Sequence, residues 1–228
     1  MDFFNRLVAE TETERVGLLS APIIARCFNG DIDVDDYVAF LTQAYHHVRH
    51  TVPLMMAVGA RLPPDQEWLR EAVAEYIEEE IGHQEWILND IAACGFDKEA
   101  VRHSTPAVET ELMVAYAYDT INRVNPLGFF GMVHVLEGTS TKLAEQVADI
   151  VSKTLQLPKQ AFSYLYSHGA LDQEHVAFFA RLMNRIENPA DQNQIIHSCN
   201  VFYRLYGNIF RALDGVPRVQ PRLRSVSS

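Results

Sequence analysis

Apolar residues recur every three or four positions along almost the entire chain, which is the spacing of one buried face of an α-helix. No stretch alternates convincingly between polar and apolar residues, and no hairpin signal is present. The pattern therefore predicts an all-α fold with about seven helices. The expected helices cover a short segment after Pro22 and about residues 2–19, 33–60, 65–93, 106–124, 126–153, 158–187 and 191–213.

Proline and glycine mark several of the expected helix ends. Pro53 falls inside the 33–60 segment and is expected to kink or divide that helix, because proline has no backbone N–H to donate. Gly95 is expected to close the 65–93 helix, since glycine is favoured just past a helix C-terminus. Residues 95–105 are expected to form a link to the next helix.

One domain is the simplest account of the chain. The sequence contains no internal repeat and no low-complexity linker, so residues 1–214 are expected to form a single helical domain. The Pro-, Arg- and Ser-rich tail, residues 215–228, has little to bury and is expected to be mobile or to pack on a neighbour. A hydrophobic content of 48% is ordinary for a globular protein with a substantial core.

The composition limits the classes of partner. The 228-residue chain has a formal net charge of −11, which opposes a nucleic-acid partner because phosphate binding needs a basic surface. No apolar run reaches the ~20 residues of a membrane span, and no secretory signal is visible at the N-terminus, so no membrane partner is expected. The three cysteines are widely spaced, which fits a reducing compartment; a cytoplasmic location is expected.

The stretch around His168, Asp172 and His175 carries the strongest candidate chemistry. On an α-helix these three positions fall within roughly 60° of one another, so they share one face. Two imidazoles and a carboxylate on one face are ligands that non-haem iron prefers. The simpler interpretation is a helix with a His–Asp hydrogen bond and an exposed histidine. The triplet alone does not decide between them.

The 65–93 segment offers a second pair of ligands. Glu80 and His83 are spaced three residues apart, and Glu-x-x-His is a pairing by which helical bundles present a carboxylate and an imidazole to a dinuclear metal centre. Glu79 also points the right way, and the choice of Glu80 over Glu79 stays open. The simpler interpretation is an acidic, solvated helix face that happens to precede a histidine.

Glu137 is the acid that is hardest to explain as a surface residue. It lies in a stretch that is apolar on every side, and an unpaired carboxylate in an apolar interior costs several kcal/mol. It is therefore expected to be protonated, paired or bound to a cation; an arginine-paired structural role is the alternative. Gly131 and Gly138 nearby would let another helix approach closely. With the two motifs above, Glu137 completes three carboxylates and three imidazoles, enough for two iron or manganese ions.

These residues resemble the motifs of the haem-oxygenase-like diiron oxidases and oxygenases, which share an all-helical fold with the TenA-like and PqqC-like proteins. The family pattern is Glu-x-x-His, a lone Glu some fifty residues later, and His-x3-Asp-x2-His near the end. The six matching positions are Glu80, His83, Glu137, His168, Asp172 and His175. The resemblance implies a haem-oxygenase-like bundle of about seven helices, often a homodimer. It also implies two Fe (Mn possible) and O2 as co-substrate, acting on a small amino-acid-like or carboxylic-acid molecule.

One departure from the family concerns the third expected helix. Some relatives carry an additional Glu near the segment Tyr45–His50, where this chain has Arg49 and His50. The departure puts fatty-acid decarboxylation in doubt. Arg49 is a candidate for binding a substrate carboxylate, because a guanidinium makes a two-pronged hydrogen bond to that group. His50 and Tyr116 are further candidates for the substrate pocket.

Two other functions stay open at this point. One is a metal-independent enzyme on the same fold, as in PqqC-like oxidases or in TenA-like hydrolases, which use a nucleophilic cysteine. Cys94 and Cys199 have no obvious activating partner in the sequence, which opposes the hydrolase. The other is a non-catalytic helical binding protein, which leaves Glu137 and the His–Asp–His face unexplained.

Overall fold

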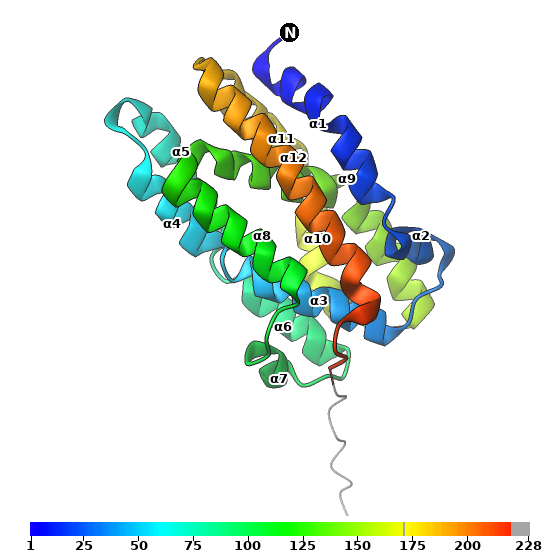
Figure 1. Ribbon diagram of the computed structural model, residues 1–228. Coiled ribbons are helices and arrows are strands. Elements are labelled where there is room, and N and C mark those ends of the chain that lie inside the picture. Colours follow the sequence, from blue (N-terminus) through cyan, green and yellow to red (C-terminus); the bar gives the residue numbers. More distant parts are fainter. Residues whose placement is uncertain (171, 220–228) are drawn as a thin grey trace, which may run out of the picture.

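The computed structural model describes residues 1–170 and 172–219, and within them the side chains except those of 139–145 and 168–175. Every regular element in this described part of the chain is helical, which confirms the all-α class (Figure 1). The α-helices are α1 (Phe3–Leu19), α2 (Pro22–Asn29), α3 (Val34–Val48), α4 (Thr51–Arg61), α5 (Glu67–Glu80), α6 (His83–Ala93), α7 (Lys98–Arg102), α8 (Val108–Asp119), α9 (Phe129–Leu155), α10 (Ser163–Ala170), α11 (Asp172–Asn184) and α12 (Pro189–Ala212). No helix within the described residues is both long and apolar enough to cross a membrane.

Local sequence signals set several helix starts. Asp33 caps α3: its carboxylate accepts a hydrogen bond from the backbone N–H of Asp36, and the Asp36 carboxylate accepts one from the N–H of Asp33. This reciprocal pair satisfies two backbone donors that a helix N-terminus otherwise leaves without partners. At α12, Asn188 caps the helix and Pro189 occupies its first turn, where a missing N–H does no harm. The expected last helix, about 191–213, is confirmed with an earlier start.

The structure divides the expected 33–60 helix where the sequence suggests. α3 ends at Val48 and α4 begins at Thr51, with Pro53 in the first turn of α4. A proline in the first turn removes no hydrogen bond from the helix. The prediction that Pro53 kinks or divides this segment is therefore confirmed.

The prediction of one continuous helix over 65–93 is wrong. After the short 3-10 turn Pro64–Gln66, α5 ends at Glu80 and α6 begins at His83. Gly82 between them has a φ of 96°, a left-handed backbone conformation that glycine adopts without a steric cost. The break therefore falls inside the Glu-x-x-His motif.

Other helix boundaries also differ from the pattern. The expected link 95–105 contains the five-residue helix α7, whose start is capped by the Asp97 carboxylate. Helix α8 passes into a π-helical turn, Thr120–Val124, before Asn125 ends it. The short 3-10 turns Pro126–Gly128, Lys159–Phe162 and Leu213–Gly215 lie before α9, before α10 and after α12. The expected 158–187 helix comprises this second turn, α10 and α11, with residue 171 between the two α-helices outside the described residues.

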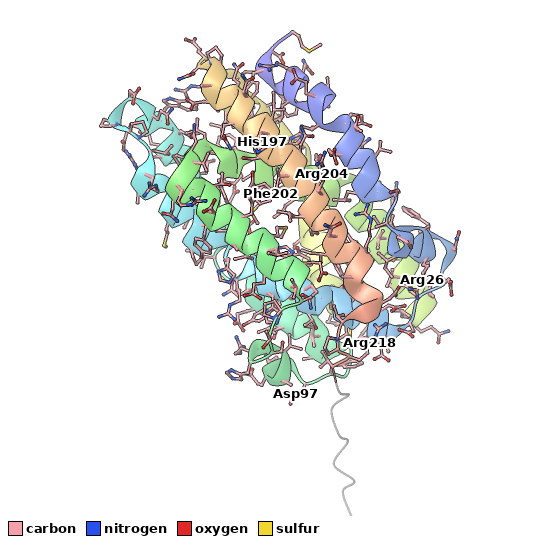
Figure 2. All side chains as sticks on the ribbon, viewed as in Figure 1. Arg26, Asp97, His197, Phe202, Arg204 and Arg218 are labelled. Atoms are coloured by element: carbon pink, nitrogen blue, oxygen red, sulfur yellow. The ribbon has the colours of Figure 1, made fainter. Side chains whose placement is uncertain are left out.

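Helix α12 runs through the middle of the bundle, between α1 and α8, and also packs on α9 (Figure 1). Phe202 is fully buried, and its ring meets the ring of Tyr116 on α8 edge-on with centroids 5.0 Å apart (Figure 2). Arg204, two residues later, pairs with Glu14 of α1 at 2.6 Å. The two side chains thus tie α12 to the helices on either side.

Gly131 explains how α9 and α12 approach so closely. A Cβ atom built on Gly131 would lie 2.5 Å from the backbone N of Cys199 and 2.9 Å from the carbonyl oxygen of Ile195. No larger residue fits without moving the backbone of α12. The expectation that a glycine near Glu137 permits a close helix approach is confirmed at Gly131, whereas a Cβ on Gly138 would meet nothing within 4 Å.

The first residues of the expected tail pack on the domain. Val216 is buried, and Arg218 donates to the Asp36 carboxylate at 3.0 Å, the same carboxylate that Arg26 of α2 contacts at 2.5 Å (Figure 2). The expectation of a mobile tail stays a prediction for residues 220–228, which lie outside the described residues.

Candidate functional site

The Glu80 carboxylate and the His83 imidazole form a pair across the break between α5 and α6. Glu80 Oε2 lies 3.0 Å from His83 Nδ1, and His83 is buried with its ring 4.1 Å from that of Trp86. An ionised carboxylate only accepts hydrogen bonds, so this contact places the ring proton of His83 on Nδ1. Nε2 is then the ring nitrogen that could bind a metal, as in carboxylate–histidine–metal arrangements.

Glu137 stands on α9, where the charges of two other carboxylates, Glu80 and Glu79, act on it. Burial, with a smaller contribution from the negative charges of Glu80 and Glu79, raises its pKa to about 8. Among the described residues, the charged groups that shift the Glu137 pKa are thus both acids, and no arginine is among them. Negative charges that act on an enclosed carboxyl favour its protonated form or a bound cation. The arginine-paired interpretation of Glu137 receives no support from the described residues.

The structure also bears on the choice between Glu80 and Glu79. Both carboxylates act on Glu137, but Glu79 is exposed whereas the side chain of Glu80 is only 25% exposed. Glu80 is in addition the one that contacts His83. These facts favour Glu80 as the ligand.

Tyr76 is a polar residue of this group that sequence reasoning missed. It lies one turn before Glu80 on α5, its side chain is buried, and its hydroxyl has no hydrogen-bond partner among the described residues. Burial raises its pKa, and the carboxylate of Glu137 adds to the effect. A buried hydroxyl without a partner costs ~1–3 kcal/mol. A buried hydroxyl without a partner among the described residues, close enough to Glu137 for that charge to raise its pKa, is what a site with an additional bound group would leave, so the kinds of donor present suit a metal centre.

A cavity of about 180 Å³ opens beside Glu137, between α1, α9, α11 and α12. Its wall combines aromatic rings, aliphatic side chains and one ion pair. The lining residues are Phe4, Val8, Thr11, Glu12, Arg15, His134, Glu137, Gly138, Val176, Phe179 and Tyr203. Glu137 therefore keeps some accessible surface although protein encloses it. Burial lowers the pKa of His134 to about 4, so this ring is neutral at pH 7.

The side chains of His168, Asp172 and His175 lie outside the described residues. Their helices are placed: α10 packs on α9 and α6, and α11 packs on α9 and α1. The His–Asp–His motif is thus carried by helices that lie against those bearing Glu137 and His83. Among the side chains that are described, no three of His, Cys, Asp or Glu form a cluster able to hold a metal ion. The six-ligand set stays a prediction.

The three residues suggested for substrate binding lie elsewhere in the fold. Arg49 is exposed and places its guanidinium 5.6 Å from the ring of Tyr45. His50 Nδ1 lies 3.1 Å from the hydroxyl of Tyr118. Tyr116 packs on α12 as described above, and none of these three suggested residues lines the cavity beside Glu137. The sequence does not reveal that α1 contributes residues to this cavity. The amphipathic pattern of a helix shows which face is buried but not which part of the protein that face packs on.

The cysteines are not activated. Burial raises the pKa of the Cys27 thiol to about 11, and that of the Cys94 and Cys199 thiols to about 12. A nucleophilic cysteine needs the opposite shift, toward the thiolate. The cysteine-dependent hydrolase therefore gains no support.

Comparison with known proteins adds a family and a fold. Residues 38–207 match the family model described as iron-containing redox enzyme. No curated protein sequence matches the chain.

Several solved structures share the architecture. A domain of unknown function with a haem-oxygenase-like fold from Shewanella denitrificans superposes with a TM-score of 0.83 at 23% identity, over 93% of this chain and 92% of that one. A TenA homologue from Pseudomonas syringae pv. tomato gives 0.79 at 12% identity, over 94% and 93%. Haem oxygenase from Leptospira interrogans gives 0.73 at 15% identity, over 92% and 99%. These likenesses establish the haem-oxygenase-like helical fold.

Proposed function

Because the chain belongs to the family of iron-containing redox enzymes, we propose that it is a non-haem diiron oxygenase or oxidase. It uses O2 to oxidise a small organic molecule, amino-acid-like or a carboxylic acid. The observation that carries the proposal is the position of Glu137 on the wall of a cavity, where burial and the charges of Glu80 and Glu79 raise its pKa to about 8.

The ligands in this proposal are Glu80, His83 and Glu137, together with His168, Asp172 and His175 of α10 and α11. Mixed oxygen and nitrogen ligands suit iron, with manganese as the second metal to test. Bound iron supplies the redox chemistry and the positions for O2 that protein side chains lack.

The chain's own residues prepare this site in three ways. The Glu80 carboxylate orients the His83 ring, so that Nε2 faces away from the hydrogen bond. Glu137 holds a proton below a pH of about 8 in the metal-free protein and releases it when a cation binds, because ligands bind in the deprotonated form. The aromatic rings on the cavity wall offer the substrate an apolar surface.

The proposal is tested by adding Fe(II) to the purified chain under anaerobic conditions and counting bound iron, then admitting O2 and measuring its consumption. We expect about two irons per chain and O2 consumption that depends on them. The variants Glu137→Ala and His175→Ala are each expected to lose iron while keeping their helical circular dichroism. Retention of iron by both variants, or no iron in the folded wild-type chain, would overturn the proposal.

A further inference from the structure

Asp90 is a buried carboxylate that the proposed mechanism does not use. It lies on α6, seven residues after His83, which is about two turns further along the same face of the helix. The exposed fraction of Asp90 is 0%. A buried carboxylate destabilises the fold unless its oxygens accept hydrogen bonds, so the partners of Asp90 show what it holds in place.

The hydrogen-bond partners of Asp90 among the described residues lie at the start of α10. The hydroxyl of Ser163 donates to Asp90 Oδ1, and the backbone N–H of Tyr164 donates to Asp90 Oδ2 at 2.9 Å. Burial raises the pKa of the Asp90 carboxyl, and hydrogen bonds from the Ser163 side chain and from the N–H groups of Tyr164 and Ser163 oppose that shift. The first N–H groups of a helix have no partners within the helix. Asp90 therefore caps α10 from a different helix.

Helix α10 carries one of the proposed ligands. His168 follows Tyr164 by four residues, which is one turn of the helix. Tyr164 itself is buried. Burial is the main cause of its raised pKa, and the charges of Tyr206 and Glu80 add to the effect, so the Tyr164 phenol lies near the Glu80 carboxylate. The start of α10 is thus bonded to α6 through Asp90 and lies close to Glu80 of α5 through Tyr164.

The contact between α6 and α10 combines apolar packing with these hydrogen bonds. The two helices pack on each other, and Ile87 of α6 and Leu165 of α10 belong to one buried apolar cluster. Apolar packing has no preferred direction, whereas a hydrogen bond restricts both the distance and the angle between its groups. Asp90 therefore gives the two helices a defined position along each other.

We propose that Asp90 is a positioning residue of the metal centre: its hydrogen bonds hold the start of α10 against α6 and thereby set the position of His168 relative to His83. A metal site works only when its ligands lie within about 0.5 Å of their productive positions, so a small shift of α10 is enough to impair it. The role of Asp90 in metal binding rests on the proposed diiron function; its hold on α10 does not.

Three variants change this contact in steps. Asp90→Ala leaves the Ser163 hydroxyl and the Tyr164 N–H without their acceptor. Asp90→Asn is the conservative variant and is expected to keep both contacts, because an amide oxygen accepts from the N–H and an amide nitrogen donates to the hydroxyl oxygen. Ser163→Ala removes one hydrogen bond from the side of α10 and decides the question if Asp90→Ala does not fold.

Asp33→Ala is the matched control. The Asp33 carboxylate also caps a helix, because it accepts a hydrogen bond from the N–H of Asp36 at 2.8 Å. That helix is α3, which carries none of the six proposed ligands. Both alanine variants at aspartate thus remove a cap, but only the one at Asp90 affects a helix that bears a ligand.

The first measurement is amide hydrogen exchange of the metal-free full chain, which reports the opening of individual helices. Exchange in residues 163–170 is expected to be about tenfold faster in Asp90→Ala than in wild type, as the loss of a helix cap predicts. Asp90→Asn is expected to stay within about threefold of wild type, because its contacts remain. Asp33→Ala is expected to leave exchange in these residues unchanged.

The second measurement uses Co(II) as the probe, because its visible absorption reports the geometry of its ligands. Asp90→Ala is expected to bind Co(II) about tenfold or more weakly than wild type and with an altered spectrum, since losing a group that orients metal ligands costs about 10–100-fold in affinity. Ser163→Ala is expected to bind about threefold more weakly, as the loss of one hydrogen bond predicts. Asp90→Asn is expected to restore the wild-type spectrum, and Asp33→Ala to keep both affinity and spectrum.

The proposal is overturned if the Asp90→Ala variant has the exchange of wild type in α10, or the Co(II) affinity and spectrum of wild type, or if Asp90→Asn loses as much as Asp90→Ala. Should Asp90→Ala not fold, wild-type Co(II) binding by Ser163→Ala overturns it. Metal binding that ignores Asp90 leaves the diiron function standing. A wild-type chain that binds no metal overturns the diiron function and the part of Asp90 in it, and the exchange data then decide only whether Asp90 holds α10.

Discussion

Glu80 and His83 lie on opposite sides of a helix break, and yet Glu80 Oε2 and His83 Nδ1 are 3.0 Å apart. In a continuous helix, three-residue spacing alone would set this contact. Here the left-handed backbone of Gly82 sets it, with a φ of 96°. The local backbone therefore controls the orientation of one proposed ligand toward another.

Replacing Gly82 tests this control. Gly82→Ala is expected to cost about 1–2 kcal/mol of stability, because alanine is strained in the left-handed region, and also to lower iron uptake. Gly95→Ala is the control, since Gly95 has a similar φ of 90° and neither glycine has a neighbour that a Cβ would meet within 4 Å. Thermal unfolding and the iron count measure the two effects. Equal iron uptake by both variants would contradict the role of the Gly82 backbone.

The Tyr76 hydroxyl, which has no partner among the described residues, predicts that its removal does not lower the stability of the metal-free protein. Tyr76→Phe is expected to leave the stability of the metal-free protein unchanged or slightly raised, because it removes a buried group without a hydrogen-bond partner among the described residues. Tyr37→Phe is the control: the Tyr37 hydroxyl donates to the carbonyl oxygen of Ala161 at 2.8 Å, and its loss is expected to cost about 0.5–1.5 kcal/mol. Urea unfolding compares the two variants, and an equal loss of stability in both would show that Tyr76 is satisfied.

The raised pKa of Glu137 makes the stability of the metal-free protein depend on pH. Between pH 4.5 and about 8 the folded protein holds a proton on Glu137 that the unfolded chain has released. The contribution of Glu137 to the free energy of unfolding is therefore largest below pH 4.5. It falls as the pH rises to about 8, by up to a few kcal/mol in total. Glu137→Gln cannot titrate and lacks this fall.

Urea unfolding in the presence of a chelator, at about pH 5 and pH 8, measures the effect. The free energy of unfolding of Glu137→Gln minus that of wild type is expected to be larger at pH 8 than at pH 5. The expected difference between the two pH values is about 2 kcal/mol or more. Glu71→Gln, at an exposed position of α5, serves as the control and is expected to follow wild type. A Glu137→Gln variant with the wild-type pH dependence would show that the carboxyl is already ionised in the metal-free fold.

The close contact at Gly131 predicts that a larger residue there destabilises the protein, and Gly17 provides a control in the same chain. Gly131→Ala is expected to destabilise the protein by about 1–3 kcal/mol, because its Cβ would collide with the backbone of α12 at Cys199. Gly17→Ala, in helix α1 with open space around it, is expected to stabilise the protein by about 0.5–1 kcal/mol. Thermal unfolding decides, and a neutral Gly131→Ala would contradict the close approach of α9 and α12.

The sequence predicts the helical class well because the period of apolar residues is a local property that the fold preserves. It fails at Gly82, because a helix can tolerate a single glycine, so the residue alone does not reveal a break. It also misses α7, whose five residues are too few to show a period.

The candidate site is predictable only where burial can be read locally. Glu137 stands out because apolar residues surround it in the sequence, and the structure does enclose it. Glu12 and Arg15 read as an ordinary surface pair on α1, and only the packing of α1 over α9, α11 and α12 turns them toward a cavity. The sequence offers Arg49 as a ligand for a carboxylate on its chemistry alone, and the fold places it on the surface beside Tyr45.

The central claim is that ligands from separate helices meet around two metal ions. Crystals of the chain grown anaerobically with Fe(II), with anomalous diffraction recorded at the iron edge, test it most directly. We expect two iron peaks within bonding distance of the six side chains, about 2.0–2.2 Å for each nitrogen or oxygen ligand. Those side chains are Glu80, His83, Glu137, His168, Asp172 and His175. A map with no iron beside Glu137, or with iron bound by other residues, would contradict the account.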